Sequence, residues 1–167
     1  MSRGFVKEDD LEHAGTDMPE RPISVHVNYV TPNGLKQLQQ QALALDKTRA
    51  LLITQKDDAS AAQKLAVVDR DLRYLSVRLE QAELVEPSIE AKDTVLFGAT
   101  VQTEDENGDT HTVTIVGEDE ADITQHKVSW VSPLAKALIG HKVGESVVWK
   151  RPAGDLNLEI IDIEYSL

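Results

Sequence analysis

Apolar residues in the middle of the chain recur with alternating spacings of three and four. The first set of positions is 35, 38, 42, 45, 49 and 52, and the second is 65, 68, 72, 75, 79 and 82. All of these positions are apolar except Arg49. This repeat is typical of the seam of a coiled coil, and it predicts two helices between residues 31 and 86.

Local signals place the ends of these helices. Thr31-Pro32 supplies a capping residue followed by proline at the first helical position. Between the two seams, Asp57 or Asp58 can cap the second helix, and Ser60-x-x-Gln63 resembles a capping box. Because the connection is short, the helices must run antiparallel, with position 35 opposite 82 and position 52 opposite 65. Such a hairpin encloses no pocket, so it favours a spacer, a dimerisation coil or a rod that carries its tip to a distant place.

From Thr94 onward the hydrophobic period becomes two, which is typical of strands. Two alternating stretches flank Glu106-Asn107-Gly108, a strong hairpin signal. Ser132-Pro133 begins a short helix that Gly140 ends. Further strands are expected at 127–131, 145–150 and 156–165. The apolar parity of the last strand changes at Ile160-Ile161, which predicts a bulge, and the whole stretch predicts a small antiparallel sheet with one short helix.

Charge divides the chain into three parts. Residues 1–30 hold three basic and six acidic side chains and predict an acidic, flexible arm. Residues 31–86, the hairpin, hold eight of each sign, and residues 87–167, the sheet domain, hold six basic and fifteen acidic side chains. The net charge of −12 disfavours direct adhesion to DNA or RNA, so any role near nucleic acid runs through a protein partner or a local site.

Motifs for catalysis are absent from the sequence. The five histidines are scattered, there is no HExxH, P-loop or GxGxxG motif, and the acidic run 118–122 is more typical of a solvated turn than of a cation site. Trp130 and Trp149 lie in strand patterns, where core packing is the usual role. The lack of cysteine fits a reducing cytoplasm, and no apolar run predicts a membrane span or a secretory signal.

Several short sequence segments along the chain resemble those of a known protein family. They are YVTPNGLKQL (29–38), DRDLRYLSVRLEQAELVE (69–86), VLFGATV (95–101), IVGEDEAD (115–122), VSPLAKALIGHKVGESV (131–147) and IEY (163–165). With these segments the chain resembles the Gre family of bacterial transcription elongation factors, GreA and GreB. The resemblance implies an α+β protein whose sheet domain has an FKBP-like fold and docks on core RNA polymerase, while the coiled coil enters the secondary channel of the polymerase.

The resemblance also implies partners and site residues. We expect a monomer that meets nucleic acid only within the transcription complex and has no cofactor of its own beyond a Mg²⁺ shared with the polymerase active site. Ser132, Pro133 and Leu134 match the segment expected to contact the polymerase.

The tip of the hairpin departs from the family. The hairpin is about two heptads shorter, and removing one heptad from each arm keeps both seams in register. The family tip motif then falls on residues 57–65, where Asp58 matches the first tip acid and metal ligand, Ser60 matches a serine and Ala61 replaces the second acid. An ungapped alignment instead puts Leu51 and Thr54 where both acids belong. Neither keeps the acidic pair of the family tip, so we expect weak stimulation of RNA cleavage.

Three functional hypotheses follow. The first is a Gre-type factor that modulates elongation or backtracked complexes as an accessory factor, not as an enzyme. The second is a protein that occupies the channel and inhibits, akin to inhibitory Gre homologues and nucleoside-diphosphate-kinase regulators. The third is a peptidyl-prolyl isomerase, which the FKBP-like fold suggests but which needs an aromatic pocket that few residues here can build.

Overall fold

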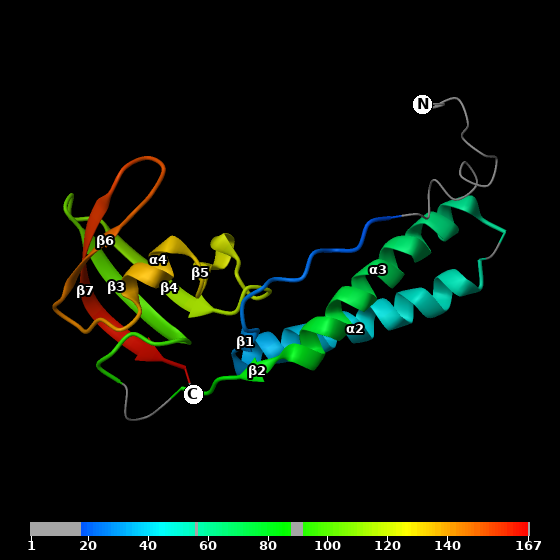
Figure 1. The fold of residues 1–167 in the computed structure, drawn as a ribbon, viewed down its shortest axis with the longest axis horizontal. Coiled ribbons are helices and arrows are strands. Elements are labelled where there is room, and N and C mark those ends of the chain that lie inside the picture. Colours follow the sequence, from blue (N-terminus) through cyan, green and yellow to red (C-terminus); the bar gives the residue numbers. More distant parts are fainter. Residues whose placement is uncertain (1–17, 56, 88–91, 167) are drawn as a thin grey trace. The chain divides into compact units, whose positions relative to one another are not determined.

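The computed structural model describes residues 18–55, 57–87 and 92–166 (Figure 1). The chain divides into two compact units. The helical unit comprises the described residues up to His26 together with Leu38–Gln81, and the sheet unit comprises Val27–Gln37 and the described residues from Ala82 onward. The sheet unit therefore begins earlier than the predicted boundary at residue 87, and it also takes in the end of the predicted arm and the first turn of the first helix.

Two long helices form the predicted hairpin: α2 spans Pro32–Ile53 and α3 spans Ala59–Gln81. The start of α2 is as predicted, because the Thr31 hydroxyl accepts a hydrogen bond from the Gly34 amide at 2.9 Å. Two observations near the tip agree with the predicted pairing of seam positions between the two helices. Arg49 Nε donates to Asp69 Oδ1 at 2.7 Å, one residue from its predicted partner position. In the neighbouring layer, closer to the tip, Leu52 and Leu65 line one cavity.

The sheet unit holds a five-stranded sheet. Its strands are β3 (Ala99–Asp105), β4 (Thr110–Val116), β5 (Lys127–Ser129), β6 (Ser146–Trp149) and β7 (Leu156–Tyr165), in the order β5-β4-β3-β7-β6. Most pairs are antiparallel as predicted, but β5 pairs parallel to β4. The reason is the connection after β4, which includes the 3₁₀ turn η2 (Ile123–Gln125) and brings Lys127 back beside Thr114 of β4.

Alternate strand residues and the short helix α4 (Pro133–Leu138) build one apolar core. Its buried members are Val95, Ala99, Val101, Ile115, Leu134, Ala135, Leu138, Val147, Leu156, Leu158, Ile160 and Ile163. Trp130 and Trp149 pack against this core, as predicted. The register between β3 and β7 passes from Asp162 to Ile160 and skips Ile161, which confirms the predicted bulge.

A second, two-stranded sheet was not predicted. β1 (Tyr29–Val30) pairs in parallel with β2 (Glu83–Leu84), so a segment just before α2 lies beside a segment just after α3. Val30 is only 3% exposed, although the sequence analysis assigns it to a flexible arm. Residues 1–17 of that predicted arm lie outside the described residues. In the part of the chain that the structure describes, no helix is long and apolar enough to cross a membrane.

Candidate functional site

The tip of the hairpin is formed by the turn into α3. The Asp58 side chain caps this helix, because its Oδ1 accepts a hydrogen bond from the Ser60 amide at 2.9 Å. Asp57, Asp58 and Ser60 are all exposed. Ser60 itself lies inside α3, which starts at Ala59, so the capping box suggested for Ser60 is wrong. Asp58 comes earlier in the chain and is a strong capping residue, so the helix begins before Ser60 can act as its cap.

Behind this turn the tip is apolar. Ala61, which the symmetric alignment matches to the second tip acid of the family, is only 3% exposed. Its side chain lines a cavity of about 250 Å³ together with Leu52, Ile53, Gln55, Ala62 and Leu65. An acidic side chain at position 61 would therefore point into an apolar space between the helices and would be costly to bury.

The described residues of the tip do not form a complete metal site. No group of three or more His, Cys, Asp or Glu side chains that could hold a metal ion occurs among the residues that the structure describes. A magnesium ion requires several oxygen ligands in near-octahedral geometry. Asp58 supplies one carboxylate, of which one oxygen already accepts the capping hydrogen bond.

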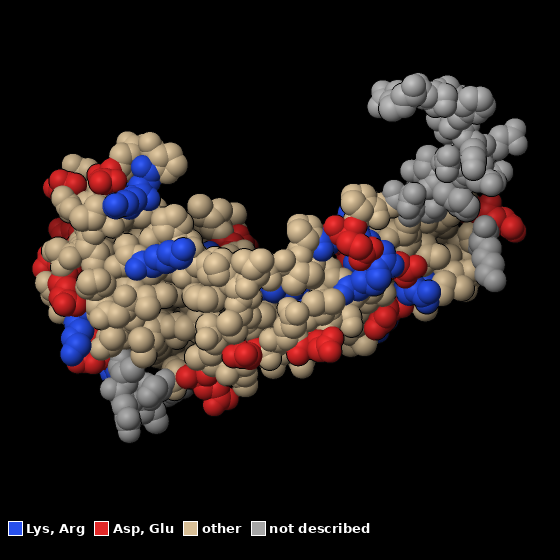
Figure 2. Space-filling model, in the orientation of Figure 1, with Lys and Arg blue, Asp and Glu red and all other residues tan. Residues whose placement is uncertain are grey.

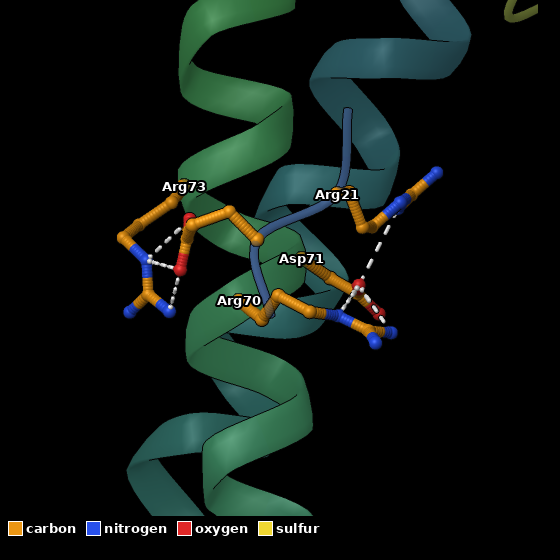
Figure 3. A network of polar contacts seen from close by, with 5 residues as sticks. Arg21, Arg70, Asp71 and Arg73 are labelled. Carbon is orange, nitrogen blue, oxygen red and sulfur yellow. Dashed lines mark hydrogen bonds and ion pairs between the residues drawn. The ribbon is translucent and has the colours of Figure 1, made fainter. Parts of the chain in front are cut away.

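A segment of the predicted arm contacts α3. This segment, residues 18–26, is called the strap below. Arg73 donates to both carboxylate oxygens of Glu20 at 2.6 to 3.0 Å, and the hydrogen bond from Arg73 lowers the pKa of Glu20 (Figure 3). Arg21 pairs with Asp71 at 3.4 Å and lies over the ring of Tyr74, 3.8 Å from its centroid. The strap is thus held to one side of α3 by polar contacts.

The hairpin presents mixed charge on its surface. Along the visible face of the helices, Lys and Arg side chains lie beside Asp and Glu side chains and not in a field of one sign (Figure 2). This pattern agrees with the equal numbers of acidic and basic residues between positions 31 and 86. A mixed surface gives little long-range attraction for a polyanion such as RNA.

The predicted polymerase-binding segment lies at the start of α4. Ser132 is the N-cap of this helix, and its hydroxyl accepts from the Ala135 amide at 3.3 Å. Pro133 is exposed, whereas Leu134 is 6% exposed and belongs to the core. Ser132 and Pro133 are therefore placed where a partner can reach them, while the Leu134 side chain serves the packing of the sheet unit.

One polar cluster around a buried carboxylate was not predicted from the sequence. It consists of Thr31, Asn33, Glu120 and Lys127, all in the sheet unit, and is called the root cluster below. Glu120 lies in the acidic run that was interpreted as a solvated turn, but its side chain is only 4% exposed. The Thr31 hydroxyl donates to Glu120 Oε1 at 2.5 Å, and Asn33 Nδ2 donates to Oε2 at 3.0 Å. The solvated-turn interpretation is therefore wrong for Glu120.

The arrangement of these parts defines a class of protein, in which a helical hairpin with an exposed tip is joined to a small sheet domain. Comparison with known proteins agrees with this class. Residues 90–165 match the family model for the C-terminal part of transcription elongation factors GreA and GreB.

Individual relatives extend the match over most of the chain. Transcription elongation factor GreB from Neisseria meningitidis serogroup B is 37% identical over 153 residues, which covers 83% of this chain and 94% of that protein. Transcription elongation factor GreA from Halorhodospira halophila is 35% identical over 127 residues, covering 75% of this chain and 80% of that protein. Among solved structures, GreA factor homolog 1 from Thermus thermophilus is 26% identical, with a TM-score of 0.41, 83% of this chain covered and 99% of that one. The chain belongs to the GreA/GreB family of transcription elongation factors.

Proposed function

We propose that this protein binds core RNA polymerase as a monomer in the cytoplasm and inserts its helical hairpin into the secondary channel. It modulates elongation or backtracked complexes and stimulates little RNA cleavage. It acts as an accessory factor and has no catalytic activity of its own. Membership of the GreA/GreB family supports the choice of partner.

The buried position of Ala61 is the observation that carries the proposal of weak cleavage. Two acids spaced by three residues on one helix can converge on a metal ion, because positions i and i+3 are neighbours. Here Asp58 has Ala61 at that position, and Ala61 is turned toward the apolar side of the tip. The tip can thus offer a Mg²⁺ in the polymerase active site at most the carboxylate of Asp58 from this pair.

A cleavage assay on a defined backtracked complex tests this proposal. The wild-type protein at saturating concentration should cleave far more slowly than a cleavage-proficient GreB used as reference. Binding to core polymerase, measured separately with a fluorescent label, should be retained. Cleavage as fast as that by the reference protein would overturn the proposal of a weakened tip, and absence of binding would overturn the proposed partner.

The tip can be tested with a pair of neighbouring substitutions. Ala61→Glu should destabilise the hairpin and leave cleavage low, because the new carboxylate enters the apolar space that Ala61 lines. Gln63→Glu, at an exposed position of α3 that does not line this cavity, is the control and should leave the stability of the hairpin nearly unchanged. Efficient cleavage by a well-folded Ala61→Glu variant would contradict this account of the tip.

The docking surface can be tested with a pair of prolines in the sheet unit. Pro133→Ala removes the exposed ring at the start of α4 and should weaken binding to core polymerase by about tenfold, the equivalent of about 1.4 kcal/mol. Pro152→Ala changes an exposed proline in the turn between β6 and β7 and should leave binding unchanged. Equal affinities for the two variants would remove Pro133 from the proposed contact.

An inhibitory role is the second candidate, and the apolar tip favours it. A hairpin that enters the channel without completing a metal site would block access to the channel and not assist cleavage. The same assay separates the candidates when a cleavage-proficient GreB is present, because an inhibitor lowers its cleavage rate in proportion to channel occupancy.

A further inference from the structure

The root cluster places a buried carboxylate against the first turn of α2. Glu120 comes from the segment after β4, while Thr31 and Asn33 flank the first helical residue, Pro32. Lys127 Nζ lies 3.5 Å from Glu120 Oε2 and balances its charge. Three donors from two separate segments thus converge on one side chain. A buried carboxylate needs such hydrogen-bond and ionic partners to offset the loss of water.

Two close approaches restrict the packing of this cluster on the side of α2 and β1. A Cβ atom at Gly34 would lie 2.7 Å from Glu120 Oε1, so glycine at this helical position permits the carboxylate to approach. A Cβ atom at Gly117 would lie 2.3 Å from the carbonyl oxygen of Tyr29, so the start of the Glu120 segment also fits closely against β1. The Tyr29 ring meets the Trp130 ring edge-on with centroids 5.0 Å apart. The start of α2 is therefore fixed in two ways: the backbone before it packs closely against Gly117, and the side chains of its first turn bond to Glu120.

Small movements at this point are amplified along the helix. α2 has 22 residues and is therefore about 33 Å long. A rotation of about 10° at its first turn would displace its far end by about 6 Å. Chemistry that depends on placing a tip is sensitive to shifts of about 1 Å.

We propose that Glu120 is a positioning residue: its carboxylate fixes the first turn of α2 in the sheet unit and thereby sets the line along which the helix carries its tip. The hydrogen bonds from Thr31 and Asn33 make this hold directional, since each donor must keep its angle to a carboxylate oxygen. Apolar packing alone would leave the helix freer to rotate, because the hydrophobic effect is not directional.

The loss of Glu120 should loosen this hold without unfolding the protein. A cavity of about 460 Å³, lined among others by Thr100, Thr114 and Lys127, adjoins the root cluster. Water can therefore reach Thr31 and Asn33 when the carboxylate is removed, and it can replace part of the lost hydrogen bonding. The apolar core of the sheet unit does not include Glu120.

Distances between two spin labels test the proposal directly. Because the sequence has no cysteine, two introduced cysteines can be labelled specifically, one at Asp46 on the exposed side of α2 and one at Asp109 in the β3–β4 turn. The distance distribution should be about twofold broader in Glu120→Ala than in wild type, as a helix released at its root would sweep several ångströms. Glu164→Ala, which removes an exposed carboxylate from β7, is the matched control and should leave the distribution unchanged.

A second variant keeps the charge and tests the geometry. Alanine normally stabilises a helix relative to glycine, but in Gly34→Ala the new Cβ must push the Glu120 carboxylate away. This variant should also broaden the distribution, and it decides the question if Glu120→Ala does not fold. An unchanged distribution in folded Glu120→Ala, or in Gly34→Ala alone should Glu120→Ala fail to fold, would overturn the proposal.

The consequence for transcription rests on the proposed function. Glu120→Ala should bind core polymerase with nearly wild-type affinity, because Pro133 is untouched, while its maximal effect on backtracked complexes at saturation falls severalfold. A merely destabilising change would lower the apparent affinity as well, through the smaller folded fraction. Failure of the proposed function would appear as no effect of the wild-type protein on polymerase, whereas the spin-label distances need no polymerase and judge the positioning role alone.

Discussion

The two units of this protein use burial in different ways. The sheet unit concentrates twelve buried apolar residues in one core, whereas α3 in the helical unit buries only Ala61, Val68, Leu75 and Arg78. Most other seam positions of the hairpin are half-buried. A two-helix layer has solvent on both sides, so each seam residue is covered by one partner helix and little else. The hairpin is therefore stabilised by many small contributions along its length, while the sheet unit depends on a few large ones.

Truncation in the core of the sheet unit should have the largest effect. Leu158, the third residue of β7, is 1% exposed, and Leu158→Ala should lower the free energy of unfolding by about 2–5 kcal/mol through lost burial and a residual cavity. Urea denaturation followed by tryptophan fluorescence measures this loss, since both tryptophans lie in the sheet unit. Asn157→Ala, at the neighbouring exposed position, is the control. A loss below about 1 kcal/mol would contradict a concentrated core.

Truncation in the seam should have a smaller effect. Leu75 is 4% exposed, and Leu75→Ala should cost about 2 kcal/mol, near the lower limit for such changes, because the two helices can close toward each other over the gap. Amide hydrogen exchange should show faster exchange in α2 and α3 and little change in β3 or β7. Ser76→Ala serves as the exposed control. If amide hydrogens throughout the sheet also exchanged faster in Leu75→Ala, the hairpin and the sheet unit would not be stabilised separately, which would contradict this comparison.

Acid should act on the sheet unit through Asp105. This carboxylate accepts from His111 Nε2 at 2.9 Å and from the backbone amides of Asn107 and Asp109. These bonds, that from His111 foremost, lower the pKa of Asp105 in the folded state. Because the folded value lies below the unfolded value of about 3.9, the stabilisation is present above that pH and is lost as the pH falls through the folded pKa.

The substitution Asp105→Asn tests this dependence. It should make the free energy of unfolding less dependent on pH below about 4, where the wild-type protein loses the contribution of the carboxylate. Asp162→Asn, at an exposed position on β7, should retain the wild-type profile. Parallel profiles for wild type and Asp105→Asn would refute the role of this carboxylate. The free energy of unfolding is measured by chemical denaturation at a series of pH values from about 2.5 to about 7, which brackets the range in which carboxyl groups titrate.

The strap should give the smallest effect on global stability. The Glu20–Arg73 pair is exposed, and exposed ion pairs contribute little because water and salt screen them. Glu20→Gln should leave the unfolding transition nearly unchanged while shifting the side-chain NMR signal of Arg73, and high salt should shift the same signal in the wild type. A loss of stability as large as that in Leu75→Ala would show that the strap is an integral part of the hairpin.

Local patterns in the sequence were sufficient for the elements of the fold. The three-four repeat predicted both helices and the layer that joins Leu52 to Leu65. Strand alternation, Gly108 and the change of parity at Ile160-Ile161 predicted the β3–β4 hairpin and the bulge in β7. These features depend on residues that are close in sequence, and backbone geometry repeats with a fixed period in helices and strands. The family, too, could be identified from short sequence segments along the chain.

The tertiary structure alone decided where single side chains point and which distant segments meet. The acidic run around Glu120 has the composition of a solvated turn, yet its carboxylate is buried because Thr31 and Asn33, 89 and 87 residues away, supply donors. Ala61 is one of several alanines near the tip in the sequence, and only the packing of α2 against α3 turns it toward the apolar side of the tip. Burial and hydrogen bonding between remote segments depend on the whole chain, and no local period records them.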